Sequence, residues 1–157
     1  RFRFGSEIPP VVPLKIKIEI NCREHFNILG LQKVPFNINS PWFAGYCNIT
    51  TYKAEELLGT KLRTLYQRSK GRDLFDLGKA LLLLPNLDTQ ALLECYRGYM
   101  TFVVDKLPTQ KQFTQNLETK IANPEFIGDT TALLRMGEQF DPALVHQLIL
   151  TKLIEKL

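Results

Sequence analysis

Apolar and polar residues alternate in the first part of the chain. This alternation predicts two strands with one buried face each, over Arg1 to Gly5 and over Leu14 to Asn21. A third strand is predicted over Phe43 to Tyr52, after a turn over Asn37 to Trp42. In the second strand we expect the core-facing residues to be Leu14, Ile16, Ile18 and Ile20. The opposite face would then carry Lys15, Lys17, Glu19 and Asn21.

From residue 53 the apolar positions recur at helical spacing. Three helices are predicted over about Lys53 to Ser69, Asp73 to Leu84 and Asp88 to Lys106. Two further helices are predicted to start at a capping box formed by Thr109 and Gln112, and at Asp141, which a proline follows. The helix over Asp73 to Leu84 is apolar nearly all round, so we expect it to be central in the core. The sequence therefore predicts an α+β fold, with a small β-sheet region over residues 1–52 and a helical region over residues 53–157 packed on it as one compact unit.

Composition narrows the classes of protein without naming one. The chain has 157 residues, of which 45% are hydrophobic, and a net charge of +4; a mild positive excess permits an RNA or nucleotide partner. No apolar run approaches the roughly 18 residues of a membrane span, so no membrane partner is expected. Three widely spaced cysteines argue against a disulfide framework and favour a cytoplasmic location. The pair Cys22 and His25 has the spacing of half a zinc site, but ordinary packing is the better interpretation.

Lys61 is the first candidate for chemistry. It lies four residues from both Leu57 and Leu65, inside the apolar stripe of its predicted helix, where an unpartnered ammonium would be costly. Asp73 and Asp76 follow on one face of the next helix, so we expect Lys61 to point towards Asp76 or towards a face shared with Glu19. Three simpler alternatives remain open: Lys61 bridges two helices, Asp73 caps a helix, and the surrounding basic residues form a solvated surface.

The same residues resemble a known family. Residues 55–68 read E-E-x-x-x-x-K-L-x-x-L-x-x-R, residues 72–77 read R-D-L-F-D-L, and residues 17–21 read K-I-E-I-N. In this order and at this spacing, the motifs resemble the AbiEii/AbiGii family of nucleotidyltransferase-like toxins, and the resemblance runs from about Arg1 to Leu157. It implies a polymerase-beta-like nucleotidyltransferase core and a bacterial toxin–antitoxin or abortive-infection system for phage defence.

The resemblance also implies ligands and residue roles. The activity would be transfer of a nucleotide from an NTP to an RNA acceptor such as tRNA, with Mg²⁺ as cofactor and a cognate antitoxin as partner. Glu19 would be a catalytic, metal-binding acid, and Lys61 and Asp76 would also be catalytic. Nucleotide or RNA contacts would come from Lys17, Arg68, Arg72 and Asp73. For Glu19, the alternative is an exposed glutamate paired with Lys15 or Lys17.

One motif of the family is missing. A Gly-Ser turn followed by D-x-[DE] is expected, but Gly5 and Ser6 are followed by Glu7 and a proline-rich stretch, and no Met begins the chain. We therefore expect the C-terminal part of a longer protein, inactive by itself. The alternative is a noncatalytic helical binding module of the same fold. A G-S turn followed by D-x-[DE] in the residues encoded before Arg1 would support the enzyme, and the absence of this motif there would support the binding module.

Overall fold

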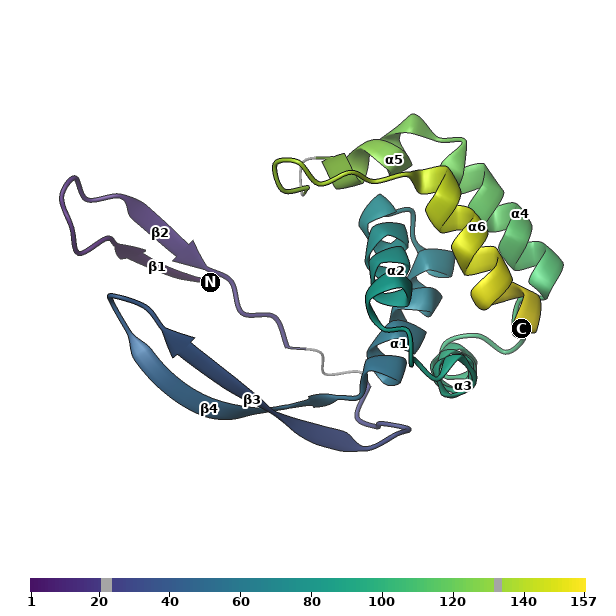
Figure 1. Ribbon diagram of the computed structural model, residues 1–157, viewed down its shortest axis with the longest axis horizontal. Helices are drawn as coiled ribbons and strands as arrows, with labels where there is room; N and C mark the ends of the chain where they lie inside the picture. Colours follow the sequence, from purple (N-terminus) through teal and green to yellow (C-terminus); the bar gives the residue numbers. More distant parts are fainter. Residues whose placement is uncertain (21–23, 132–133) are drawn as a thin grey trace.

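Two β-hairpins precede a set of packed helices in the computed structural model, which describes residues 1–20, 24–131 and 134–157 (Figure 1). The elements are β1 (Phe2–Gly5), β2 (Pro13–Ile16), β3 (Leu31–Asn39), β4 (Ala44–Tyr52), α1 (Ala54–Gln67), α2 (Gly71–Leu83), α3 (Thr89–Thr101), α4 (Gln110–Ile121), α5 (Pro124–Thr131), α6 (Pro142–Lys152) and a 3₁₀ turn (Ile154–Lys156). The predicted α+β fold class is confirmed. None of the helices in the described ranges is long and apolar enough to cross a membrane.

The strands form two separate antiparallel pairs. Phe2 lies opposite Ile16 and Phe4 opposite Leu14 in the first pair, and the second pair runs from Leu31 opposite Tyr52 to Asn39 opposite Ala44. Both hairpins extend away from the helices (Figure 1). Directly opposite residues share a face, so β1–β2 has an apolar face of Phe2, Phe4, Leu14 and Ile16, and β3–β4 has one of Val34, Phe36, Ile38 and Ile49.

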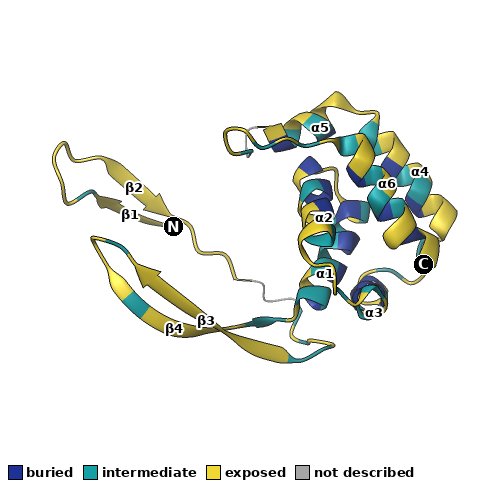
Figure 2. Ribbon diagram, in the orientation of Figure 1, coloured by how far each residue is buried: buried dark blue, intermediate teal, exposed yellow. Residues whose placement is uncertain are grey.

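The expectation of a buried second strand is wrong. β2 ends at Ile16, and Leu14, Ile16, Ile18 and Ile20 are all exposed (Figure 2). The physical reason is that alternation identifies an apolar face but not the layer that covers it, and no helix of the described chain packs on β1–β2. Asn21, the predicted end of this strand, and Cys22, half of the predicted Cys–His pair, lie outside the described residues.

The predicted turn over Asn37 to Trp42 is also partly wrong, because β3 continues to Asn39. Pro35 obscures the alternation in the sequence, and it is tolerated because a two-stranded sheet leaves each strand an open edge. The chain reverses over residues 40–43 instead, where the Ser40 hydroxyl accepts a hydrogen bond from the Phe43 N–H (3.1 Å).

The core lies among the helices. Dark blue marks the inner sides of α1, α2 and α3 in Figure 2. The largest fully buried side chains are Tyr96, Phe113, Phe126, Leu62, Leu65, Leu74, Leu77, Leu92, Met100, Leu117, Ile149 and Leu153. The second helix is central as predicted only in its first half, since Leu74 and Leu77 are buried but Leu82 and Leu83 are exposed.

A buried carboxylate joins the segment before β3 to the helices. Glu56 of α1 accepts hydrogen bonds from the N–H groups of Ile28 (2.8 Å) and Leu29 (3.0 Å) and from the Tyr99 hydroxyl of α3 (2.7 Å). Beside it, Arg63 forms an ion pair with Glu24 (2.5 Å). These contacts fix residues 24–29 against α1 and α3.

Candidate functional site

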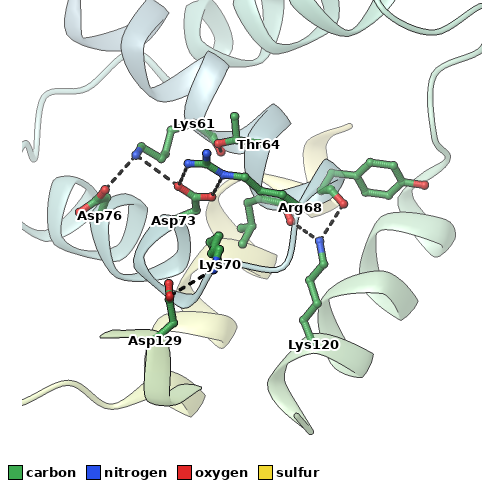
Figure 3. A network of polar contacts seen from close by, with 10 residues as sticks. Lys61, Thr64, Arg68, Lys70, Asp73, Asp76, Lys120 and Asp129 are labelled. Carbon is green, nitrogen blue, oxygen red and sulfur yellow. Dashed lines mark hydrogen bonds and ion pairs between the residues drawn. The ribbon is translucent and has the colours of Figure 1, made fainter. Parts of the chain in front are cut away.

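The end of α1 and the start of α2 bring four of the candidate residues together, Lys61, Arg68, Asp73 and Asp76 (Figure 3). The last turn of α1 ends at Arg68, whose N–H donates to the Thr64 carbonyl. Three residues later Gly71 begins α2, and a Cβ at this position would lie 1.9 Å from the Phe126 carbonyl oxygen of α5. Only glycine allows this approach, so the short basic turn is held close to α5.

Asp73 is the centre of the site. Its carboxylate is 0% exposed and receives two parallel hydrogen bonds from Arg68, from Nε to Oδ2 (2.6 Å) and from Nη2 to Oδ1 (2.8 Å). The ammonium of Lys61 lies 3.3 Å from Oδ1. Burial by itself would raise the pKa of Asp73, but the hydrogen bonds and charges of Arg68 and Lys61 outweigh it and hold that pKa below its ordinary value. The carboxylate therefore stays ionised.

Lys61 connects this buried carboxylate with an outer one. Its Nζ lies 2.9 Å from Oδ2 of Asp76, and its side chain is 29% exposed. The predicted orientation of Lys61 towards Asp76 is confirmed. Asp76, however, is 46% exposed and not the inward acid of the pair. The helix-capping interpretation of Asp73 is wrong, because Lys70 is the N-cap residue and Asp73 is the third residue of α2.

Glu19 lies outside this cluster as far as the described contacts go. It is an exposed glutamate that forms an ion pair with Lys17, which is the simpler alternative drawn from the sequence. Hydrogen bonds or ion pairs between Glu19 or Lys17 and the cluster are absent from the described residues. Arg72 is exposed on α2.

The carboxylates in the described ranges do not fit a Mg²⁺ site. Magnesium prefers several oxygen ligands in octahedral geometry, and no group of three acidic, histidine or cysteine side chains gathers within the described residues. Both oxygens of Asp73 are already hydrogen-bonded to Arg68, and Glu19 is paired with Lys17.

Lys120 of α4 belongs to the site and was not found by the sequence reasoning. Its ammonium donates to the carbonyl oxygens of Leu65 and of Tyr66 (2.7 Å for Tyr66), in the last turn of α1. Burial lowers the pKa of Lys120 to about 8, against the opposing charge of Asp73. The signal was present, since Lys120 follows Leu117 by three residues and so extends the apolar stripe of its helix, as Lys61 does in α1.

The cluster has donors left over for an anion. Four cations, Lys61, Arg68, Lys70 and Lys120, stand among three carboxylates, Asp73, Asp76 and Asp129 (Figure 3). Arg68 is 47% exposed and uses two N–H groups on Asp73 out of the five that a guanidinium has. Asp73 holds both Arg68 and the partly exposed Lys61, and Arg68 has further N–H groups that do not bond to Asp73. The arrangement therefore suits a phosphate.

A comparison with models of protein families identifies a family for this chain. A family model described as nucleotidyl transferase AbiEii toxin, type IV TA system, matches residues 1–151. No curated protein and no solved structure matches the chain.

Proposed function

Since the chain belongs to the AbiEii family of nucleotidyl transferase toxins of type IV toxin–antitoxin systems, we propose that it transfers a nucleotide from an NTP to an RNA acceptor such as tRNA. Family membership also implies a cognate antitoxin. The observation that best supports the proposal is the cluster in which two partly exposed cations, Lys61 and Arg68, are held on one buried carboxylate.

In the proposed site, Lys61 and Arg68 contact phosphate groups of the nucleotide. Asp73 is a positioning residue, because it fixes both cations and has no exposed surface of its own. Asp76 holds Lys61 from the solvent side at 2.9 Å. The fixed cations favour phosphoryl chemistry, since charge developing on a transferring phosphate is stabilised best by groups already in place. Arg72 and Lys17, both exposed, are proposed contacts for RNA phosphates.

Mg²⁺ dependence is part of the proposal for the transfer reaction. Glu19, the acid that the family resemblance suggests as a ligand, is exposed and paired with Lys17, and no group of three possible metal ligands gathers within the described ranges. A titration of the transfer activity with EDTA would test the Mg²⁺ dependence directly.

The test is a transfer assay with the protein expressed from its complete gene. Each labelled NTP is incubated with total tRNA and Mg²⁺, and label in the RNA is measured. Lys61→Ala should reduce transfer by about 10²–10³-fold, the usual loss for one electrostatic contact to a developing charge. Lys111→Ala, a lysine exposed on α4, is the matched control and should be active.

Two outcomes would contradict the proposal. Equal transfer by the wild type and Lys61→Ala would remove Lys61 from the site while leaving the activity intact. RNA binding by the wild type without any transfer would instead favour a noncatalytic binding module of the same fold.

A further inference from the structure

A pocket lined by polar residue types lies between the α1–α2 turn and one side of α4. Its volume is about 350 Å³, and it is lined by Ser69, Gln115, Asn116, Thr119, Lys120 and Asn123. Three of these side chains are carboxamides, two are hydroxyls and one is an ammonium, so the lining contains neither a carboxylate nor an apolar side chain. Lys120 connects the pocket to the cluster around Asp73, because its ammonium donates to the Tyr66 carbonyl oxygen, two residues before Arg68.

Several polar groups of the lining are not used by the protein. The Asn116 Oδ1 atom is buried and has no hydrogen-bond partner among the described residues, which is unfavourable for a carbonyl oxygen. Asn123 uses its Oδ1 to accept from the Glu125 N–H (2.9 Å), a bond that does not involve its NH₂ group. Thr119 donates to the Gln115 backbone carbonyl (2.8 Å). The carboxamides of Gln115 and Asn116 are therefore the groups best placed for a ligand.

We propose that this pocket binds a nucleobase. A carboxamide offers a donor and an acceptor side by side, which matches the edge of a base, and unpaired RNA bases are commonly recognised by hydrogen bonds to such edges. A bare phosphate has only acceptors, so it would leave the Asn116 oxygen unpaired. Ser69 stands between Arg68 and Lys70, so a base in the pocket would have its phosphates near the basic turn.

This inference rests on the proposed function and refines it, because it assigns a place for the base beside a place for the phosphates. The base could come from the NTP or from the RNA acceptor. A base from either source would form the same kind of hydrogen bonds. The two sources are distinguished by whether removal of the carboxamides weakens the binding of the NTP or the binding of the RNA.

The test measures binding of the four NTPs and of four short single-stranded homopolymer RNAs by isothermal titration calorimetry. The wild type is compared with Gln115→Ala, with the double variant Gln115→Ala/Asn116→Ala, and with Gln147→Ala as a control on an exposed glutamine of α6. We expect the wild type to prefer one base by about tenfold and the double variant to lose that preference. The control should keep it.

The pattern of loss identifies the source of the base. Weaker NTP binding with unchanged RNA binding assigns the pocket to the NTP, and the reverse assigns it to the acceptor. A wild type without base preference, or a double variant that keeps the preference, overturns the proposal. Gln115→Ala decides the matter if the double variant does not fold, since Gln115 is exposed and is not part of the core.

A failure here differs from a failure of the proposed function. If Lys61→Ala abolishes transfer but the carboxamide variants bind every base like the wild type, only the pocket is rejected. If the carboxamide variants change base preference but Lys61→Ala transfers normally, the pocket stands and the phosphate site is rejected.

Discussion

At the scale of single residues, the main feature is that Asp73 has two cationic partners and no exposed surface. Hydrogen bonds to a charged group typically contribute about 1.5–3 kcal/mol, and Asp73 accepts them from both Arg68 and Lys61. Asp76 is in a different position, since it is half exposed and its ion pair with Lys61 is open to solvent on that side. The two aspartates should therefore respond differently to the same substitution.

We predict that Asp73→Ala lowers the free energy of unfolding by about 1.5–3 kcal/mol, because the charged hydrogen bonds of Arg68 and Lys61 to this carboxylate are lost. Asp76→Ala should cost at most about 1 kcal/mol, as for exposed ion pairs, and should impair transfer through a displaced Lys61. Chemical denaturation and transfer assays on the same samples would separate the two effects. Equal stability losses for both variants would contradict this assignment.

A second prediction concerns acid. The pKa of Asp73 in the folded protein lies below its ordinary value of 3.8, so the folded state binds fewer protons than the unfolded state. The stability that this carboxylate contributes is complete above pH 3.8 and is lost as the pH falls through the lower folded pKa. Asp73→Asn should therefore flatten the decrease in stability below about pH 4. Urea denaturation at a series of pH values would measure it, and an unchanged acid slope would contradict the ion-pair interpretation.

At the scale of elements, the contact between α1 and α3 depends on Gly59. A Cβ at this position would lie 2.7 Å from the Cys95 Cβ and 2.8 Å from the Leu92 carbonyl oxygen. Helices that approach this closely cannot accommodate a methyl group without moving apart.

We predict that Gly59→Ala destabilises the protein by about 1–3 kcal/mol, since overpacking displaces helix α3 despite the better helix propensity of alanine. Gly128→Ala in α5 is the matched control, because its Cβ would meet nothing within 4 Å. The control should be neutral or slightly stabilising. Thermal melts of both variants would decide, and a stable Gly59→Ala variant would show that the helices can separate at little cost.

Local signals in the sequence were sufficient for the starts of α3, α4 and α6, whereas α2 begins at Gly71 and not at the predicted Asp73. Asp88, the Thr109–Gln112 capping box and Asp141 all cap helices as predicted, because a cap depends on residues within one turn. By contrast, α5 was missed, since its eight residues contain Gly128 and show no repeated apolar stripe.

The site was predictable in its composition but not in its arrangement. Lys61, Arg68, Asp73 and Asp76 could be selected from spacing and charge. Which aspartate is buried depends on how Arg68 folds back beside α2, and the Lys120 contact depends on how α4 crosses the end of α1. Both are tertiary contacts, and a single helix pattern does not encode them.

At the scale of the whole molecule, Glu56 links the hairpin region to the helices. Its carboxylate is almost completely buried and accepts hydrogen bonds from two backbone N–H groups and from Tyr99. Burial and the hydrogen bond to Glu56 raise the pKa of Tyr99, so the hydroxyl stays protonated and remains a donor.

We predict that Glu56→Gln costs about 1–3 kcal/mol, because an amide has one acceptor oxygen where the carboxylate offers two, and one N–H is left unpaired. Residues 24–29 should then become more sensitive to proteolysis. The control is Glu94→Gln, an exposed glutamate of α3. Limited proteolysis beside urea denaturation would measure both effects, and unchanged cleavage would show that other contacts hold this segment.

The separation of the hairpins from the helical core has a consequence for amide hydrogen exchange. A two-stranded hairpin with both faces in water is marginally stable by itself, so the ladder hydrogen bonds of β3–β4 should open locally while α1, α2 and α3 remain folded. Exchange of the strand amides would then follow this local opening, and exchange of the buried helical amides would follow global unfolding. The chain would thus behave as two cooperative units, and a melting curve followed by helical circular dichroism would report on only one of them.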